Sequence, residues 1–376
     1  MPAITNLAEL QAISGDLAGD YWLSSDIDAS GAGFVPIAGF FTGTLDGRGY
    51  DIDDLTITVN GAGYQYGALF QSISSGTVKN LGIVDCVISV TSTNSYADAA
   101  VIAISNYENV LNCHVSGTIT LNGNGAGTCD AGGIVANNFE TIDRCKSSVD
   151  ITLNVNHANC VGTAGAFVRW NGSDGVISES YADGDVTLGI VGAGYRLLAG
   201  AFAYYNDSGL INDCYARGDA SAVGGSDYNY AAGFIVTNAG TVQNSYSTGA
   251  PTAVEGIGGF CYSNGDTITD CFWDTQTSGT AVSDGGTGKT TAEMKSQSTF
   301  TNWDFVTIWG ILSTINDGYP FFYALEELPD SPRRTDPVED KITLESIRNL
   351  EMVAMGRFRV DKEGNAVYRS RYARNA

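Results

Sequence analysis

Short hydrophobic runs broken by Gly, Asn or Asp follow one another along most of the chain. Between residues 40 and 280 no segment keeps a helical period over ten or more positions. The runs are brief and rich in β-branched residues, which predicts strands of about three to six residues, about three to each repeating unit. The chain is therefore predicted to be built mainly of β-strands.

The same order of residues recurs seven times. Each copy opens with small residues and an apolar pair, passes through a polar turn and reaches a β-branched residue. These branched residues, separated by steps of 32, 32, 35, 34, 31 and 26 positions, are Val78, Val110, Ile142, Ile177, Ile211, Val242 and Ile268. Such spacing is typical of a solenoid, whose coils bury their inner faces by stacking on one another. We expect an all-β fold, a parallel β-helix, right-handed because parallel crossovers strongly favour that hand.

Small residues recur at two places in each copy. Three positions after the branched residue, most copies carry Cys113, Cys145, Ser180, Cys214, Ser245 or Cys271. A position that accepts either Cys or Ser indicates a small inward-facing slot, so we expect a stacked row there, with a Cys113–Cys145 disulfide allowed but not required. The glycines that open most copies predict a tight corner or a left-handed backbone.

The repeated pattern resembles the GLUG repeat, best in residues 200–218 and 232–249. The resemblance covers residues 5–323 and implies a right-handed β-helix. It also implies a place among bacterial surface proteins and phage-encoded proteins, where trimeric spikes are usual. A shared fold does not by itself define a function.

The composition changes after residue 325. Residues 1–325 carry 9 Lys and Arg against 32 Asp and Glu, whereas residues 326–376 carry 10 of each. Glycine becomes rare there and prolines punctuate a linker. We expect an N-terminal cap with the first coils (1–66), the repeats (67–279), a C-terminal cap (280–325), a Pro-rich linker (326–340) and a basic docking or oligomerisation segment (341–376).

The last segment is predicted to form a small α/β element. Residues 343–355 have the pattern of an amphipathic helix, and residues 358–361 and 366–369 flank a hairpin turn at residues 362–365. An element of this size is too small to fold alone, so we expect it to anchor the chain to another protein or to make a homotrimer. The expected anchoring residues are Leu344, Ile347, Leu350, Arg357, Phe358, Arg359, Tyr368, Arg369 and Arg371.

Charge and spacing exclude several classes of function. A net charge of −23 should repel nucleic acid and anionic membranes. No apolar run of about 18 residues predicts membrane insertion. The chain has no C-x-x-C pair, so no zinc site is expected, and Asp-rich turns leave Ca²⁺ as the one cofactor to consider.

Carboxylates and tyrosines are the candidates for chemistry. Asp183 and Asp185 would lie on one face of a strand at about 7 Å, a spacing that glycoside hydrolysis can use, but the adjacent glycine indicates a turn instead. A non-enzymatic protein is therefore favoured. Repeat-equivalent aromatics that follow the Cys or Ser slot should form a stacked ladder: Tyr181, Tyr215, Tyr246 and Phe272. Tyrosines in longer loops could form a sugar- or protein-binding face: Tyr195, Tyr204, Tyr205, Tyr228 and Tyr230.

A solenoid joined by a linker to a docking segment, with no visible secretion signal, suggests a part of an assembly. The first hypothesis is a virion protein of a phage, a tailspike, fibre or capsid-decorating protein made in the host cytoplasm. Its β-helix would contact host-surface glycan, and its C-terminal segment would bind other virion proteins. The alternatives are a bacterial cell-surface adhesin and a polysaccharide depolymerase.

Overall fold

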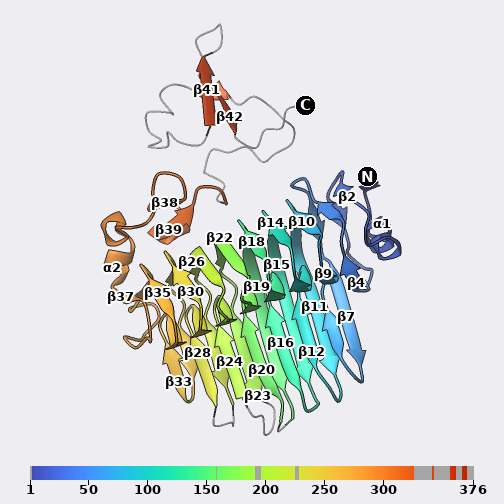
Figure 1. Cartoon of the computed structure of the whole chain (residues 1–376), viewed down its shortest axis with the longest axis horizontal. Coiled ribbons are helices and arrows are strands. Elements are labelled where there is room, and N and C mark those ends of the chain that lie inside the picture. Colours follow the sequence, from blue (N-terminus) through green and yellow to red (C-terminus); the bar gives the residue numbers. More distant parts are fainter. Residues whose placement is uncertain are drawn as a thin grey trace. The chain divides into compact units, whose positions relative to one another are not determined.

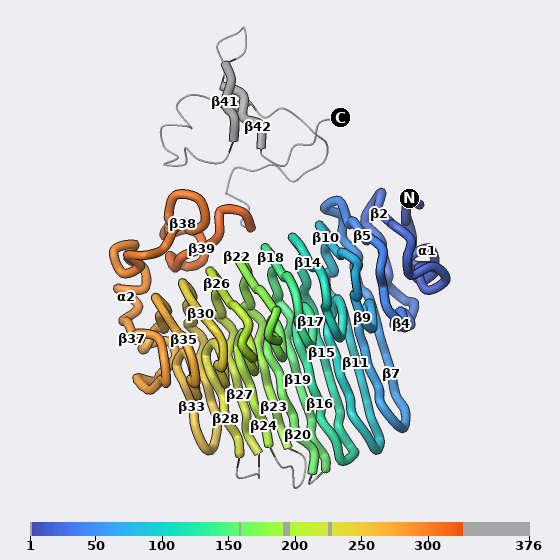
Figure 2. The backbone as a smooth tube through the Cα atoms, in the orientation of Figure 1, coloured from blue at the N-terminus to red at the C-terminus, as the bar shows by residue number. Residues whose placement is uncertain are grey.

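The computed structural model describes residues 2–157, 159–190, 196–224, 228–325, 341–342, 356–360 and 366–370. The chain divides into two compact units, Met1–Asn302 and Trp303–Ala376. The first is a right-handed parallel β-helix, as the sequence predicts, whose coils follow one another in sequence order (Figures 1 and 2). None of the helices among the described residues is long and apolar enough to cross a membrane.

A typical coil contains four strands rather than the three predicted. One such coil consists of β14 (Asn109–Leu111), β15 (His114–Gly123), β16 (Thr128–Gly132) and β17 (Val135–Asn138). The ten-residue strand β15 was not expected from the sequence. Its pairing with β11 of the preceding coil contains a β-bulge, and this irregularity hides the continuity of the strand in the sequence. The first two strands of each coil belong to sheet A, the third to sheet C and the fourth to sheet B.

Sheets B and C are continuous ladders of parallel strands. The eight strands of sheet B are β4 (Ile37–Phe41), β9 (Phe70–Ile73), β13 (Ala103–Asn106), β17, β21 (Val168–Asn171), β25 (Ala203–Asn206), β29 (Ile235–Asn238) and β34 (Cys261–Asn264). The seven strands of sheet C are β8 (Gln65–Gly67), β12 (Ala97–Ala100), β16, β20 (Val161–Gly165), β24 (Arg196–Gly200), β28 (Asn229–Ala232) and β33 (Gly256–Gly258).

Sheet A holds the remaining 22 parallel strands. They are β1 (Ala3–Ile4), β2 (Tyr21–Leu23), β3 (Ile27–Asp28), β5 (Thr44–Asp46), β6 (Asp51–Asp53), β7 (Thr56–Gly61), β10 (Thr77–Lys79), β11 (Gly82–Ser92), β14, β15, β18 (Thr141–Asp143), β19 (Lys146–Val155), β22 (Val176–Ala182), β23 (Val186–Ile190), β26 (Leu210–Ala216), β27 (Ala220–Val223), β30 (Thr241–Gln243), β31 (Tyr246–Ser247), β32 (Pro251–Ala253), β35 (Thr267–Thr269), β36 (Phe272–Asp274) and β37 (Thr287–Lys289).

The register of the strands confirms the repeat. All seven branched residues identified in the sequence pair in one unbroken row, from Val78 with Val110 to Val242 with Ile268. The pairing shifts by one residue at the first copy, where Gly67 pairs with Ala99 although Phe70 pairs with Ala103. The copies differ in length mainly in their turns, so the strands of successive coils stay in register.

The recurrent glycines form tight corners, but their backbone is not left-handed, which corrects one of the two expectations. A Cβ on Gly132, Gly165 or Gly200 would lie about 2 Å from the carbonyl oxygen three residues later: 2.0, 2.1 and 1.9 Å respectively. None of these glycines has a positive φ. Glycine is therefore favoured at these three corners between sheets C and B because the backbone turns back closely on itself, whereas Ala100 and Ala232 occupy the equivalent position in two other coils.

The left-handed position lies at another corner and is occupied by residues other than glycine. It directly precedes the small slot, with φ between 44° and 52° at Asn80, Asn112, Arg144, Glu179, Asp213, Asn244 and Asp270. Asn and Asp adopt this conformation more readily than other residues with a side chain, which explains their prevalence there.

Rows of identical side chains fill the interior. Phe167, Phe202, Phe234 and Phe260 stack with ring centroids 4.6 Å apart at each step. The predicted stacked ladder is also confirmed, although its side chains are buried outside the main interior cluster: the Tyr181–Tyr215 and Tyr215–Tyr246 centroids lie 4.5 and 5.0 Å apart, and Tyr246 pairs in register with Phe272. The predicted Cys and Ser slot is also confirmed, and all eight cysteines are free and buried.

The ends of the first unit carry α1 (Leu7–Gln11) with a 3₁₀ turn (Ala12–Gly15) and α2 (Thr291–Met294) with a second 3₁₀ turn (Gln297–Thr299). In the second unit, β38 (Trp309–Ile311) pairs antiparallel with β39 (Pro320–Phe322) beside a 3₁₀ turn (Asn316–Gly318). The predicted hairpin is present as β41 (Gly356–Val360) and β42 (Ala366–Ser370), with β40 (Lys341–Ile342) on the other edge of β42. The predicted helix at 343–355 and the linker lie outside the described residues.

Candidate binding face

The outer surfaces of sheets B and C meet at a re-entrant corner. Outward side chains from the two sheets contact each other there, which happens only where a surface folds inward. Tyr204 of β25 and Tyr262 of β34, both in sheet B, share a small apolar cluster with Tyr230 of β28 in sheet C. This cluster is separate from the main interior core.

The structure brings together three of the five tyrosines predicted to bind a ligand. Tyr204 and Tyr205 lie adjacent on β25 with ring centroids 5.9 Å apart, and Tyr230 stacks on Tyr262 at 4.4 Å. These residues sit in strands, not in the loops that the sequence suggested, because the coil has a fourth strand. Tyr228 precedes β28, is exposed and lies outside the cluster. Tyr195 lies outside the described residues.

Further aromatic side chains that the sequence analysis missed extend this row along sheet B. Trp170 of β21 pairs in register with Tyr205, its ring meets Phe139 edge-on at 5.5 Å, and Phe139 stacks on the exposed Tyr107 at 4.7 Å. We call the whole set the aromatic face: Tyr107, Phe139, Trp170, Tyr204, Tyr205, Tyr230 and Tyr262. The sequence did carry a signal for this row. After the first residue of the sheet B strand, two successive copies have a pair of large side chains, Arg169–Trp170 and Tyr204–Tyr205, whereas the next copy has Val236 and Thr237.

Arg169 holds the middle of the corner together. Its guanidinium lies 5.7 and 5.6 Å from the ring centroids of Trp170 and Tyr204. Its Nη2 is 3.0 Å from Oδ2 of the buried Asp130, and its Nε donates to Thr163 Oγ1 at 2.9 Å. A cation that joins two sheets and contacts two rings fixes the geometry of the aromatic face.

A second carboxyl group extends the corner toward the N-terminal coils. Asp98 pairs in register with Asp130 on the next coil and accepts a hydrogen bond of 2.7 Å from the Tyr64 hydroxyl. Burial, followed by repulsion from Asp130, raises the pKa of Asp98 to about 7. Burial also raises the pKa of Asp130, against the opposing effects of Arg169 and Thr163. Asp98 is thus the carboxyl group of the pair that holds a proton most readily near neutral pH.

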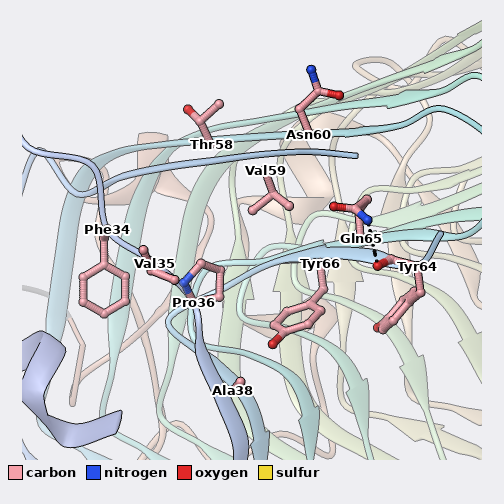
Figure 3. A pocket seen from close by; sticks show the side chains of 10 residues that line it. All are labelled: Phe34, Val35, Pro36, Ala38, Thr58, Val59, Asn60, Tyr64, Gln65 and Tyr66. Carbon is pink, nitrogen blue, oxygen red and sulfur yellow. Dashed lines mark hydrogen bonds between the residues drawn. The ribbon is translucent and has the colours of Figure 1, made fainter. Parts of the chain in front are cut away.

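Beyond Asp98 the surface opens into a pocket of about 450 Å³ (Figure 3). The rings of Tyr64 and Tyr66 and the side chains of Phe34, Val35 and Pro36 line it, together with four residues of β7 and β8 and Ala38. Since Tyr64 both lines the pocket and bonds to Asp98, the pocket and the corner form one connected surface.

The remaining candidates have structural roles or stay untested. Asp185 accepts the backbone N–H of Asp219 at 2.7 Å and donates its own N–H to Asp150 at 2.9 Å, so the predicted turn role holds. Within the described residues no group of three or more His, Cys, Asp and Glu is placed to hold a metal, and the Ca²⁺ hypothesis stays a prediction. Arg357, Phe358 and Arg359 lie on β41 and Tyr368 and Arg369 on β42, whereas Leu344, Ile347, Leu350 and Arg371 lie outside the described residues.

Comparisons with known proteins place the fold. No protein-family profile matches the chain. A protein from Bacteroides ovatus, provisionally described as an immunoglobulin A1 protease, has a crystal structure that aligns with a TM-score of 0.50 at 16% identity, covering 86% of this chain and 92% of that one. At this identity the likeness shows the β-helix fold alone.

Two curated relatives share part of the sequence. A protein of Evansella cellulosilytica, provisionally described as a Gly-rich membrane protein, is 31% identical over 182 residues, 46% of this chain. Halomucin of Haloquadratum walsbyi is 37% identical over 137 residues, 32% of this chain. The matched regions make up only 17% and 1% of the lengths of these relatives, so the chain resembles a part of much longer proteins.

Proposed function

We propose that the chain is a non-enzymatic attachment protein whose β-helix binds a surface glycan at the aromatic face. The aromatic face carries this proposal: seven rings, in contact or in register along adjacent coils, lie on the outside of a rigid scaffold. Flat aromatic rings offer the apolar faces of sugars a large contact at low entropic cost. These outward rings are not needed to fill the interior, which is packed by its own Phe ladder.

The chemistry between the rings suits hydroxylated ligands. Arg169 donates to Thr163 and Asn137 and lies beside Tyr204, and Asp130 accepts from Thr163 and Thr128. Such networks orient polar groups next to apolar rings, which is the usual composition of a specific small-ligand site. The aromatic face therefore combines stacking surface with oriented donors and acceptors.

The larger body to which the protein is attached is defined less specifically than its ligand. The C-terminal segment from residue 341 would attach the β-helix to a larger body, either a phage particle or a cell surface. Similarity to parts of a protein described as a membrane protein and of a halomucin supports the cell-surface setting. Co-purification of the full chain with phage particles would support the virion setting.

A glycan-binding screen tests the function. The full chain should bind a subset of surface polysaccharides, and the double variant Tyr204→Ala/Tyr230→Ala should lose at least about tenfold in affinity. Tyr50→Ala replaces an exposed tyrosine in the turn before β6, outside the aromatic face, and is the matched control that should bind normally. Undiminished binding by the double variant would refute the aromatic face as the site.

Glycan cleavage is a second candidate because of the Asp98 and Asp130 pair. Residues in register on adjacent strands are about 4.8 Å apart, and a neutral acid beside an ionised carboxylate is the pairing that glycoside hydrolysis uses. Against this, Asp130 is already engaged by Arg169, Thr163 and Thr128. Release of reducing ends that Asp98→Asn abolishes would favour cleavage, whereas binding without release supports attachment.

A further inference from the structure

Four of the eight cysteines lie outside the stacked row, and only two of these four are in contact with each other. In that row each thiol donates to the carbonyl oxygen two residues earlier, as Cys113 does to Leu111 at 3.4 Å and Cys214 to Asn212 at 3.3 Å. The hydroxyl of Ser180 makes the same bond to Ser178 at 2.6 Å. Thiols in the row therefore replace serine hydroxyls, and their interactions are complete without a disulfide.

Cys129 and Cys160 instead face each other. Cys129 lies on β16, and Cys160 lies in the turn before β20 on the next coil. Their Sγ atoms are 3.4 Å apart, and both residues are fully buried. The Cys160 amide donates to the carbonyl oxygen of His157 at 3.0 Å, which fixes the turn that presents its thiol.

The space in which the thiols meet depends on Gly123 at the end of β15. A Cβ at that position would lie 2.1 Å from the Cys129 Sγ and 3.2 Å from the Cys160 Sγ. Its φ is not positive, so its backbone conformation does not demand glycine. The missing side chain instead leaves room for both sulfur atoms.

We propose that Cys129 and Cys160 form an oxidation site, in which a disulfide oxidant such as oxidised glutathione joins the two thiols into a cross-link between consecutive coils. In the first step the Cys160 thiolate attacks one sulfur of glutathione disulfide and releases one glutathione thiolate. In the second, the Cys129 thiolate attacks Cys160 in the mixed disulfide and releases the other. Each glutathione thiolate takes up one of the two protons lost, so two protein thiols are oxidised and one glutathione disulfide is reduced.

Several features favour this order of events. The contact with Cys129 lowers the pKa of Cys160, which makes it the more readily formed thiolate. The two sulfur atoms already lie 3.4 Å apart, so a shift of only about 1.4 Å brings them to the length of a disulfide bond. Because both thiols are buried in the complete fold, an external oxidant reaches them fastest in a partly folded chain in which these two coils have already paired, so that the thiols are in contact, but are not yet covered.

The cross-link would close a loop between residues 31 positions apart and restrict the unfolded chain. We therefore expect the oxidised protein to melt several degrees above the reduced protein. This inference goes beyond glycan binding and does not depend on it.

A thiol census of the full chain tests the proposal. The protein is folded with oxidised glutathione or with dithiothreitol, unfolded in an alkylating reagent and digested for mass spectrometry. Six thiols should be alkylated after oxidation, and one linked peptide pair should contain residues 129 and 160. All eight thiols should be alkylated after reduction, with a lower melting temperature.

Variants separate this pair from the others. Cys129→Ser and Cys160→Ser should each lose the linked peptide and the rise in melting temperature, whereas Cys113→Ser should keep both. Eight free thiols in the wild-type chain after oxidative folding would overturn the proposal. A linked Cys113–Cys145 pair in place of Cys129–Cys160 would also overturn it, and neither result depends on the variants being stable.

Discussion

Asn171 lies in a row of buried asparagines, one per coil, that links neighbouring coils. Its Nδ2 donates to Oδ1 of Asn206 at 2.9 Å and its Oδ1 accepts from Asn138 at 2.8 Å. The row continues to Asn106 at one end and to Asn264 at the other, with every link at 2.8 or 2.9 Å. Each amide is therefore satisfied only as long as both neighbours are present.

Replacing one asparagine of the row should lower the free energy of unfolding by more than the loss of its own hydrogen bonds alone. Asn171→Leu keeps a similar volume but removes the acceptor of one Asn138 N–H and the donor to the Asn206 Oδ1, which we expect to lower the free energy of unfolding by about 2 to 4 kcal/mol. Asn264→Leu at the end of the row should cost clearly less, since it has one neighbour in the row. Urea titration of both variants would measure this, and equal losses would contradict a cooperative row.

The ionisation of Asp98 should make the stability of the protein depend on pH. Its pKa is raised from 3.8 in the unfolded chain to about 7 in the fold, so folding favours the protonated form. Above pH 3.8 the Asp98 side chain would ionise in the unfolded chain but stays protonated in the fold. The stability that the protonated side chain contributes to the folded state is therefore lost as pH rises through about 7. Asn keeps the acceptor for Tyr64 without ionising, so Asp98→Asn should gain stability relative to wild type between about pH 4 and 7.

Melting curves of both proteins from acid to neutral pH would check this. If the difference in melting temperature between wild type and Asp98→Asn stayed constant with pH, Asp98 would ionise as freely in the fold as in the unfolded chain.

At the scale of the element, two corners of the coil use different residues for different reasons. The corner between sheets C and B favours glycine because the backbone approaches itself closely, whereas the corner before the small slot has a positive φ. The sequence analysis located the first corner because glycine repeats there. It missed the second because Asn, Asp, Arg and Glu share the position, and their common backbone angle leaves no single-residue signature.

The left-handed corner predicts how Asn244 responds to substitution. Asn244→Val places a β-branched residue at φ 48°, which should cost about 1 to 2 kcal/mol more than Asn244→Gly. Both variants lose the asparagine side chain, so the difference isolates backbone strain. Equal unfolding free energies from chemical denaturation would refute this explanation of the corner.

For the whole molecule, stability should depend on the stacking of complete coils. Residues 177–210 make one step of the repeat, because Ile177 pairs in register with Ile211. Deleting that segment should leave a shorter folded β-helix, whereas deleting residues 177–193, half a step, should break the register and abolish folding. Circular dichroism and small-angle scattering distinguish these outcomes, and two equally folded deletions would contradict the stacked-coil account.

The sequence predicted the fold far better than the site. Repeat periodicity reports contacts between equivalent residues such as Val110 and Ile142, and those contacts form the solenoid. Asp98 and Asp130 are likewise equivalent residues of adjacent coils in sheet C, whereas Arg169 lies on a strand of sheet B. The proximity of Arg169 to Asp130 follows only from the inward fold between sheets B and C, which no local spacing encodes.

The central claim is that a glycan binds at the aromatic face, and a crystal structure of the full chain with its best-binding oligosaccharide tests it most directly. The account predicts sugar rings stacked on Trp170, Tyr204 or Tyr230, with hydroxyl groups within hydrogen-bonding distance of Arg169 or Asp130. A sugar bound on sheet A or on the second unit, with the aromatic face empty, would contradict it.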